Sequence, residues 1–292
     1  METNYLTDIM LPLSLAIIML GMGLSLVPAD FKRVFLYPKA ASVGILNQII
    51  ILPLVGFLLV WLFGLDNPEL AVGVMVLAAC PGGPTSNLIS HISKGDTALS
   101  ITLTAISSLI AVITIPLIVN LALSIYMQQG DYVPLPVFDT IFKLTLITLL
   151  PVSIGMLIRN KAVGFAQRMN KPVKIISGIL LVLIILAAIL NNREIFVSSF
   201  QSVGPVALSL NAGMLIIGYL SARLLRLNRA QRITISVESG IQNGTLGITI
   251  ASTLLHNDVM AISPAIYSLI MFMTAGMVIA RAHLGGKKPV AA

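Results

Sequence analysis

Residues Ile233–Leu255 read ITISVESGIQNGTLGITIASTLL, an apolar segment with a polar centre. It is long enough to cross a bilayer, for which about 20 apolar residues suffice, yet its centre holds Glu238, Gln242 and Asn243 between two glycines. A carboxylate at bilayer depth costs roughly 2.5–3.5 kcal/mol on insertion scales, so it normally faces a partner or a wet cavity. The stretch therefore predicts a discontinuous helix that holds a cation, an element from which secondary transporters build sites at the middle of the membrane.

The composition is that of a membrane protein throughout. The chain has 292 residues with a mean hydropathy of +0.98, and 10% of them are charged, against roughly 25% in soluble domains. Apolar stretches recur from one end to the other, which predicts an all-α polytopic membrane protein, residues 1–292 forming one membrane domain. The single Cys80 excludes a disulfide framework. The net charge of +7 does not call for nucleic acid, and no obligate protein partner is expected.

Nine transmembrane helices are predicted, at about residues 11–27, 41–64, 71–91, 98–126, 137–158, 175–190, 196–220, 233–256 and 259–280. Nearly all Lys and Arg residues fall in the loops of one side, whereas the opposite loops are acidic and contain one basic residue, Arg193. By the positive-inside rule the basic side faces the cytoplasm, so the N-terminus lies outside and the C-terminus in the cytoplasm. We expect a multi-pass protein of the cell (inner) membrane, in contact with the lipid bilayer.

A second interrupted span covers residues 71–91, AVGVMVLAACPGGPTSNLISH. Its Pro81-Gly82-Gly83-Pro84 segment cannot continue an α-helix, because the prolines lack N–H donors and the glycines favour other backbone angles. Thr85, Ser86 and Asn87 then open a second half-helix. Its free N–H groups and positive dipole end would form a site for an anion. A kinked helix with self-satisfied Ser and Thr is the alternative, which four breakers in a row disfavour.

Polar residues also lie in the neighbouring spans. Gln48 lies at the centre of span 41–64, and one face of span 98–126 carries hydroxyls at three- and four-residue spacing: Ser100, Thr104 and Ser107 or Ser108. Taken alone, both sets fit ordinary interhelical bonds or bonds back to helix carbonyls. If the stripe faces the broken segment of span 71–91, it forms a wall of hydroxyl oxygens.

The two interrupted spans occupy corresponding positions in the two halves of the chain. Each follows a span with amide residues and precedes a span with a proline. Pairing the first four spans with the last four shifts the chain by an odd number of spans, so the halves have opposite orientation. Interrupted segments in matching positions are the best sequence pointer to the binding site of a transporter.

The motifs CPGGPTSN at Cys80–Asn87 and ESGIQNG at Glu238–Gly244 resemble the bile acid:sodium symporter family. GMGLSL at 21–26, LNQIIILP at 46–53 and ALSITLT at 98–104 extend the resemblance over nearly the whole chain. The resemblance implies a nine-span member, an inverted repeat with its first helix missing, in which the broken spans three and eight cross. It also implies a panel domain of the spans at about 11–27, 137–158 and 175–190, beside a core domain of the spans at about 41–64, 71–91, 98–126, 196–220, 233–256 and 259–280.

The resemblance further implies two bound sodium ions. The ligands of one would be Ser86, Asn87, Ser100, Thr104 and Glu238. The ligands of the other would be Gln48, Glu238 and Gln242, with Ser239 and Ile241 serving through their carbonyls. Oxygen donors occupy every side-chain ligand position, and hard cations prefer oxygen ligands.

An anionic substrate fits these ions, because one shared carboxylate leaves two sodium ions with one net positive charge. Thr85 and Asn243, with Pro84, are the expected substrate-binding residues. Family members often have a small polar residue after CPGG, where this chain has Pro84. A bile-acid-like anion and a small carboxylate such as pantoate therefore both stay open.

The chain is thus expected to be a sodium-coupled symporter of an organic anion that works by alternating access. A proton-coupled or uncoupled organic-anion carrier on the same fold is the alternative, with Glu238 cycling protons. An enzyme is disfavoured, because His91, His256 and His283 lie at span ends or in the tail, without an HExxH-type motif. A channel is disfavoured, because a single carboxylate gives no charged ring.

Overall fold

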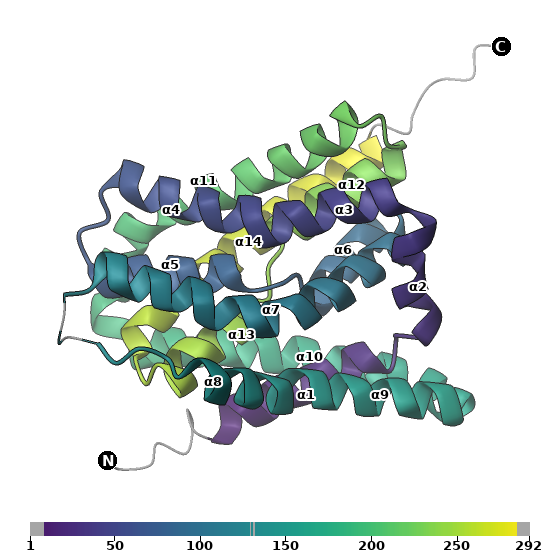
Figure 1. Ribbon diagram of the computed structural model, residues 1–292, viewed down its shortest axis with the longest axis horizontal. Helices are drawn as coiled ribbons and strands as arrows, with labels where there is room; N and C mark the ends of the chain where they lie inside the picture. The colour runs from purple at the N-terminus through teal and green to yellow at the C-terminus, as the bar shows by residue number, and fades with distance from the viewer. Residues whose placement is uncertain (1–8, 129, 131, 285–292) are drawn as a thin grey trace.

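The computed structural model describes residues 9–128, 130 and 132–284 as a helical chain (Figure 1). Its α-helices and π-helical turns (η) are, in order, α1 (Leu11–Gly23), α2 (Pro28–Leu36), α3 (Pro38–Leu46), η2 (Asn47–Ile51), α4 (Leu52–Phe63), α5 (Pro68–Ala79), α6 (Pro84–Ile92), α7 (Thr97–Tyr126), α8 (Val137–Leu144), η3 (Thr145–Leu149), α9 (Leu150–Lys161), α10 (Val163–Asn191), α11 (Arg193–Leu224), α12 (Arg229–Gly240), α13 (Gly244–Thr249), η4 (Ile250–Leu254) and α14 (Asp258–Leu284). Within these residues no strand is present. The two chain ends, including the C-terminus predicted to be cytoplasmic, lie outside the described residues.

Several helices are long and apolar enough to cross a membrane. By length and composition the described residues contain six such helices, or seven if α1 and α2, which meet at 67°, are one bent span. The helices α5, α6, α12 and α13 are too short to cross alone, because they are the halves of the two interrupted stretches. The chain is therefore a multi-pass membrane protein, and the count of nine spans and the inverted repeat remain predictions.

The first interrupted stretch leaves the helical conformation at Cys80 and resumes it at Pro84. Pro84 is the first residue of α6, so the helix starts one residue earlier than Thr85, where the sequence placed it. A proline suits this position, because its fixed φ matches the helix and its missing N–H would have no partner there. The second stretch breaks between Gly240 and Gly244, as its glycines predict.

The two breaks pair with each other inside the molecule. The backbone N–H of Asn243 donates to the carbonyl of Pro81 at 2.9 Å, and Gly82 and Gln242 form an isolated antiparallel bridge. Non-helical backbone at membrane depth is tolerated only where protein or water satisfies it. This pairing supplies such partners and fixes the ends of four half-helices at one place.

A π-helical turn positions the amides of the span that contains Gln48. The turn η2 precedes Pro53, whose ring would clash with a carbonyl four residues earlier in a regular helix. Asn47 and Gln48 are buried in this turn, where Asn47 Nδ2 donates to Ser221 Oγ at 2.9 Å. Single π-turns occur frequently at functional sites.

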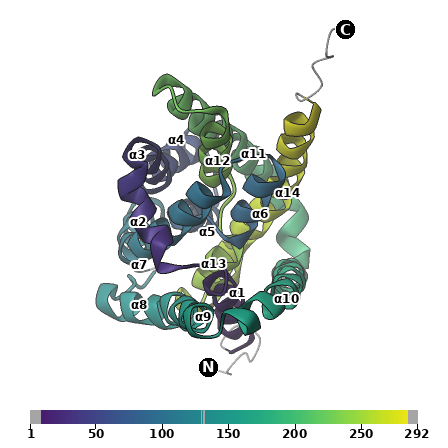
Figure 2. The same ribbon diagram turned by 90° about the vertical axis from the view of Figure 1, so that its right-hand side faces the viewer.

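Figure 2 shows α1, α8, α9 and α10 along one side of the molecule and α3, α4, α11 and α12 along the other, with α5, α6 and α13 between them. On the first side α1 and α9 approach closely at Gly23 and Gly155, where a Cβ on either would overlap backbone atoms of the other helix. The first side contains the helices of the predicted panel, and the second side contains part of the predicted core, to which α5, α6, α7, α13 and α14 also belong. Their division into two domains remains a prediction.

Candidate functional site

Glu238, on the last turn of α12, is one of two buried carboxylates among the described residues, and 3% of it is exposed. The other, Asp30, is paired with Arg33. Glu238 Oε1 accepts hydrogen bonds from Ser86 Oγ at 2.8 Å and from Ser100 Oγ at 2.5 Å. Its Oε2 accepts a hydrogen bond from Thr104 Oγ1 at 2.9 Å. Hydroxyls from α6 and α7 thus converge on one acid from α12.

Asn87 completes this group, which we call the carboxylate cluster: Ser86, Asn87, Ser100, Thr104 and Glu238. Asn87 Oδ1 lies 2.8 Å from Ser100 Oγ and 3.2 Å from Thr104 Oγ1. Each of these hydroxyls has one proton and faces both the amide oxygen and the carboxylate, so acceptor oxygens outnumber the available protons. Such a surplus of acceptor oxygens suits a cation.

No basic side chain neutralises the carboxylate. In the part of the chain that the structure describes, the ion pairs are Arg33–Asp30 and Lys143–Asp139, at 3.7 and 2.8 Å. A buried ionised carboxylate without a counter-charge is costly, so it is normally paired, bound to a metal ion or protonated. The cluster therefore requires either a cation or a proton.

Gly82 allows the carboxylate to approach the first break. A Cβ built on Gly82 would lie 2.5 Å from Glu238 Oε2 and 3.3 Å from Ser86 Oγ. Any side chain here would push the carboxylate out of the cluster. The sequence identified Gly82 only as a helix breaker. Its contact with Glu238 could not be predicted, because it arises only where two distant segments cross.

A second group of oxygen donors lies around Gln48, next to the crossing. Gln48 Nε2 donates to the carbonyl of Cys80 at 2.8 Å and to Gln242 Oε1 at 2.6 Å. Gln242 Nε2 donates to the carbonyl of Ser239 at 2.8 Å, and Ile241 is fully buried beside it. The structure thus brings together the residues predicted for the second sodium ion, and it adds the Cys80 carbonyl, which the sequence did not single out.

The donor chemistry of both groups fits an alkali ion. Among the described residues no cluster of three or more His, Cys, Asp or Glu side chains exists that could hold a transition metal. The groups consist instead of hydroxyl, amide and carbonyl oxygens with one carboxylate. Hard cations prefer such oxygen ligands to softer sulfur and nitrogen ligands.

The break of α12 is held by two residues that the sequence analysis did not assign to the site. The carbonyl of Gly240 accepts hydrogen bonds from Asn211 Nδ2 and from Tyr267 OH, both at 2.7 Å. Both side chains are buried. A lone Tyr or Asn in an apolar span gives no signal for this role, because the carbonyl that it satisfies lies far away in the sequence.

Pro84, Thr85 and Asn243 line a cavity of about 540 Å³. Its walls come mainly from α1, α6 and α10, and it extends towards the basic loops, since Ser25, His91 and Lys174 also line it. Asn87 and Gln242 belong to both this wall and the oxygen groups described above. The cavity and the oxygen groups are therefore in direct contact.

Hydrogen-bond donors face this cavity at its inner end. Asn243 caps α13, so its Oδ1 accepts from Thr245 Oγ1 at 2.8 Å and from Leu246 N at 3.1 Å. The Nδ2 of Asn243 has no acceptor among the described residues, and neither has the hydroxyl of Thr85. Because its oxygen is already occupied, Asn243 presents its NH₂ group, which suits an anionic or carbonyl oxygen.

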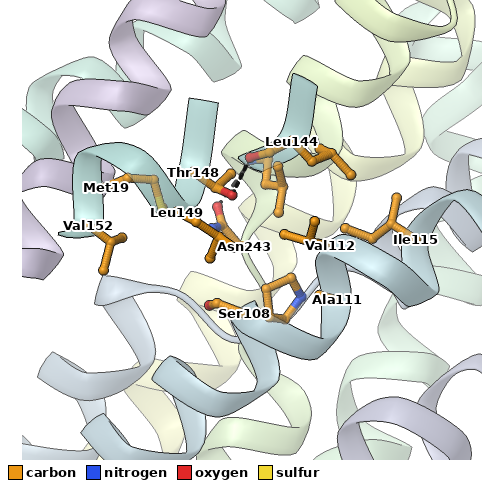
Figure 3. A pocket seen from close by; sticks show the side chains of 12 residues that line it. Met19, Ser108, Ala111, Val112, Ile115, Leu144, Thr148, Leu149, Val152 and Asn243 are labelled. Atoms are coloured by element: carbon orange, nitrogen blue, oxygen red, sulfur yellow. Dashed lines mark hydrogen bonds between the residues drawn. The ribbon is translucent and has the colours of Figure 1, made fainter. Parts of the chain in front are cut away.

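Asn243 also borders a second, much smaller cavity of about 10 Å³, room for about one water. Figure 3 shows Asn243 there among side chains of α1, α7 and the η3–α9 region, including Met19, Val112 and Thr148. The Thr148 hydroxyl donates to the carbonyl of Leu144 and is therefore occupied. Space thus exists on two sides of Asn243, wide on one and nearly closed on the other.

Comparison with known proteins identifies the family. A model described as the sodium bile acid symporter family matches residues 12–199. The chain belongs to this family. The resemblance read from the CPGG and ESGIQNG motifs is confirmed, and the matched range includes Gln48 and the hydroxyls of α6 and α7.

Named relatives of this symporter family cover most of the chain. It is 33% identical over 259 residues to the uncharacterized sodium-dependent transporter YocS of Bacillus subtilis, covering 87% of this chain and 77% of that protein. It is 31% identical over 274 residues to the hepatic sodium/bile acid cotransporter of Rattus norvegicus, covering 93% and 74%. The probable sodium/metabolite cotransporter BASS1, chloroplastic, of Oryza sativa is 30% identical over 251 residues, covering 86% of this chain and 60% of that protein. Their names describe transporters, which favours a carrier over an enzyme.

Proposed function

We propose that this protein is a sodium-coupled symporter of an organic anion. The observation that carries the proposal is the carboxylate cluster, in which Glu238 is buried among hydroxyl and amide oxygens without a basic side chain. A sodium ion supplies the missing positive charge. Ser86, Asn87, Ser100 and Thr104 would hold it together with Glu238, because hydroxyl and amide oxygens can turn their lone pairs towards a cation.

A second sodium ion would use the neighbouring group. Gln48, Gln242 and Glu238 offer side-chain oxygens there, and Ser239 and Ile241 offer carbonyls. Support comes from the convergence of Gln48 and Gln242 on one set of carbonyl oxygens. With Glu238 shared, two sodium ions leave one net positive charge beside the cavity.

That charge and the donors at the cavity favour an organic anion as substrate. Thr85 and the Asn243 amide would bind its acidic group at the start of α6, where the helix dipole adds partial positive charge. Asn87 and Gln242 line the cavity and would also hold the ions. Sodium binding would order these two side chains and thereby raise the affinity for the anion, which is a coupling free energy between the sites.

Transport would proceed by alternating access. We place the basic loops in the cytoplasm by the positive-inside rule, so the large cavity faces inwards. The small cavity on the other side of Asn243 would belong to the closed outer half of the path. Movement of the panel (α1, α8–α9 and α10) against the remaining helices would open one side and close the other. Each positive charge moved inwards gains about 2.3 kcal/mol per 100 mV.

Uptake into proteoliposomes tests the proposal. Purified protein is given labelled cholate, pantoate and other carboxylates under an inward gradient of sodium or of potassium chloride, at equal pH on both sides. Uptake of at least one anion should require sodium. Equal uptake with potassium would refute sodium coupling. In a separate sodium-free assay with a pH gradient, uptake driven by that gradient would favour the proton-coupled carrier, in which Glu238 binds a proton.

A further inference from the structure

The large cavity is polar at two ends and apolar between them. Its inner end holds Thr85 and Asn243. Its other end, the mouth on the side of the basic loops, holds Lys174 of α10 and His91 of α6. The residues between them on α6 and α10 are mainly apolar, namely Leu88, Leu181 and Val182, with Asn87 and Ser177 as the polar members.

Contacts between α1 and α10 place Lys174 on the side of the crossing that faces the basic loops. Asn170 Nδ2 donates to Ser25 Oγ, just after the end of α1, at 3.4 Å, and a Cβ on Gly21 would touch Val173 and Ser177. The two helices therefore run antiparallel, with Lys174 near the end of α1 and Leu181 near Ile18. Met19 shares the small cavity with Asn243 (Figure 3), which puts this turn of α1 at the level of the crossing.

The separation between the two polar ends follows from helix geometry. Thr85 and His91, which line the two ends on α6, are six positions apart, and the rise of about 1.5 Å per residue makes this about 9 Å. Lys174, Ser177 and Leu181 all line the cavity at helical spacing, so they share one face. A ligand that reaches both ends must therefore be elongated.

Lys174 has no counter-charge. None of the described residues that line the cavity is acidic, and Lys174 takes part in neither of the two ion pairs found in the described chain. In the open cavity water solvates its ammonium group. Closure would remove that water, and a buried ammonium without a partner costs several kcal/mol.

We propose that Lys174 binds a second anionic group of the substrate, so that the preferred substrate is an elongated dianion whose charges flank an apolar spacer of about 9 Å. The inference rests on the proposed function, because the closing step and the two sodium ions come from it. Two sodium ions with Glu238 contribute one positive charge and Lys174 a second one. A dianion neutralises both before the cavity closes.

Octanedioate, octanoate and butanedioate test this proposal. The first is an elongated dianion, the second has the same length but one charge, and the third has two charges but is short. Their affinities are measured by isothermal titration calorimetry on the purified full chain in saturating sodium. Octanedioate should bind at least about tenfold more tightly than either control, which corresponds to about 1.4 kcal/mol.

Variants on α10 assign this difference to one side chain. Lys174→Gln should weaken octanedioate binding about tenfold, to the level of octanoate, and leave octanoate within about twofold. Lys174→Arg should restore the preference. Lys171→Gln, on the same helix but not on the cavity wall, is the matched control and should behave as the unmodified protein.

Two results would overturn the inference. One is an octanedioate preference that survives in Lys174→Gln. The other is an unmodified protein that binds none of the three acids, or binds octanoate as tightly as octanedioate, while sodium still stabilises it and drives the uptake of another carboxylate. A protein without any sodium response would instead refute the proposed function itself.

Discussion

Replacing Glu238 with Gln separates sodium binding from folding. The Gln side chain keeps one acceptor oxygen for Ser86 and Ser100 and places an NH₂ group where Oε2 now faces Thr104. Thr104 Oγ1 can accept from this NH₂, because its own proton has the Ser100 carbonyl as an alternative acceptor at 3.0 Å. No buried polar group is left without a partner. In the absence of sodium, the free energy of unfolding of the variant should therefore lie within about 1 kcal/mol of that of the unmodified protein.

The sodium response should differ far more. A ligand that binds only the folded protein stabilises it by about 2.7 kcal/mol when present at 100 times its Kd. The unmodified protein should gain about this amount from saturating sodium, and Glu238→Gln should gain almost none, because the carboxylate belongs to both proposed ion sites. The substitution should therefore lower the stability of the protein in sodium and change it little in potassium.

Cys80 provides the assay. It is the only cysteine of the sequence and is 1% exposed, so a thiol-reactive dye reports unfolding on heating. Melting is followed in sodium chloride and in potassium chloride at equal ionic strength. Glu194→Gln, which neutralises an exposed carboxylate on α11, is the matched control and should keep the full sodium response. A Glu238→Gln variant that sodium stabilises as much as the unmodified protein would refute the reasoning.

Three further predictions follow from single contacts. Gly82→Ala should abolish the stabilisation by sodium, because the added methyl group would lie 2.5 Å from Glu238 Oε2. Gly213→Ala, whose methyl group would meet open space, is the control and should keep it in the same melting assay. Gln48→Leu should remove one ion site, so the sodium dependence of uptake should change from sigmoidal to hyperbolic, and an unchanged Hill coefficient would contradict a second site there. Thr85→Val should weaken anion binding by about tenfold, because one hydrogen bond to a charged group is lost, and it should leave the stabilisation by sodium intact. Equal anion affinity of the variant and the unmodified protein by calorimetry would exclude this contact.

The sequence predicted the parts of the site that depend on local chemistry. Pro81 to Pro84 and Gly240 to Gly244 break their helices because of their own backbone preferences, so both breaks are found at these residues. An acid in an apolar span needs partners at any position, so Glu238 was identifiable before its partners were known.

Other parts of the site depend on packing, which the sequence does not display. The contact of Gly82 with Glu238 and the bonds from Asn211 and Tyr267 to the Gly240 carbonyl join distant segments. The position of Lys174 on the cavity wall follows only from the arrangement of α1, α6 and α10 in space. On sequence grounds Lys174 was one of many basic residues on the side assigned to the cytoplasm.

The central claim is that oxygen atoms from two broken helices and α7 surround an alkali ion at Glu238. Two high-resolution experimental structures, one in saturating sodium chloride and one in potassium chloride, provide the critical measurement. We predict a density peak within coordination distance of Glu238 and the oxygens of Ser86, Asn87, Ser100 and Thr104 in sodium, and no such peak in potassium. A carboxylate cluster without a peak in saturating sodium would contradict the claim.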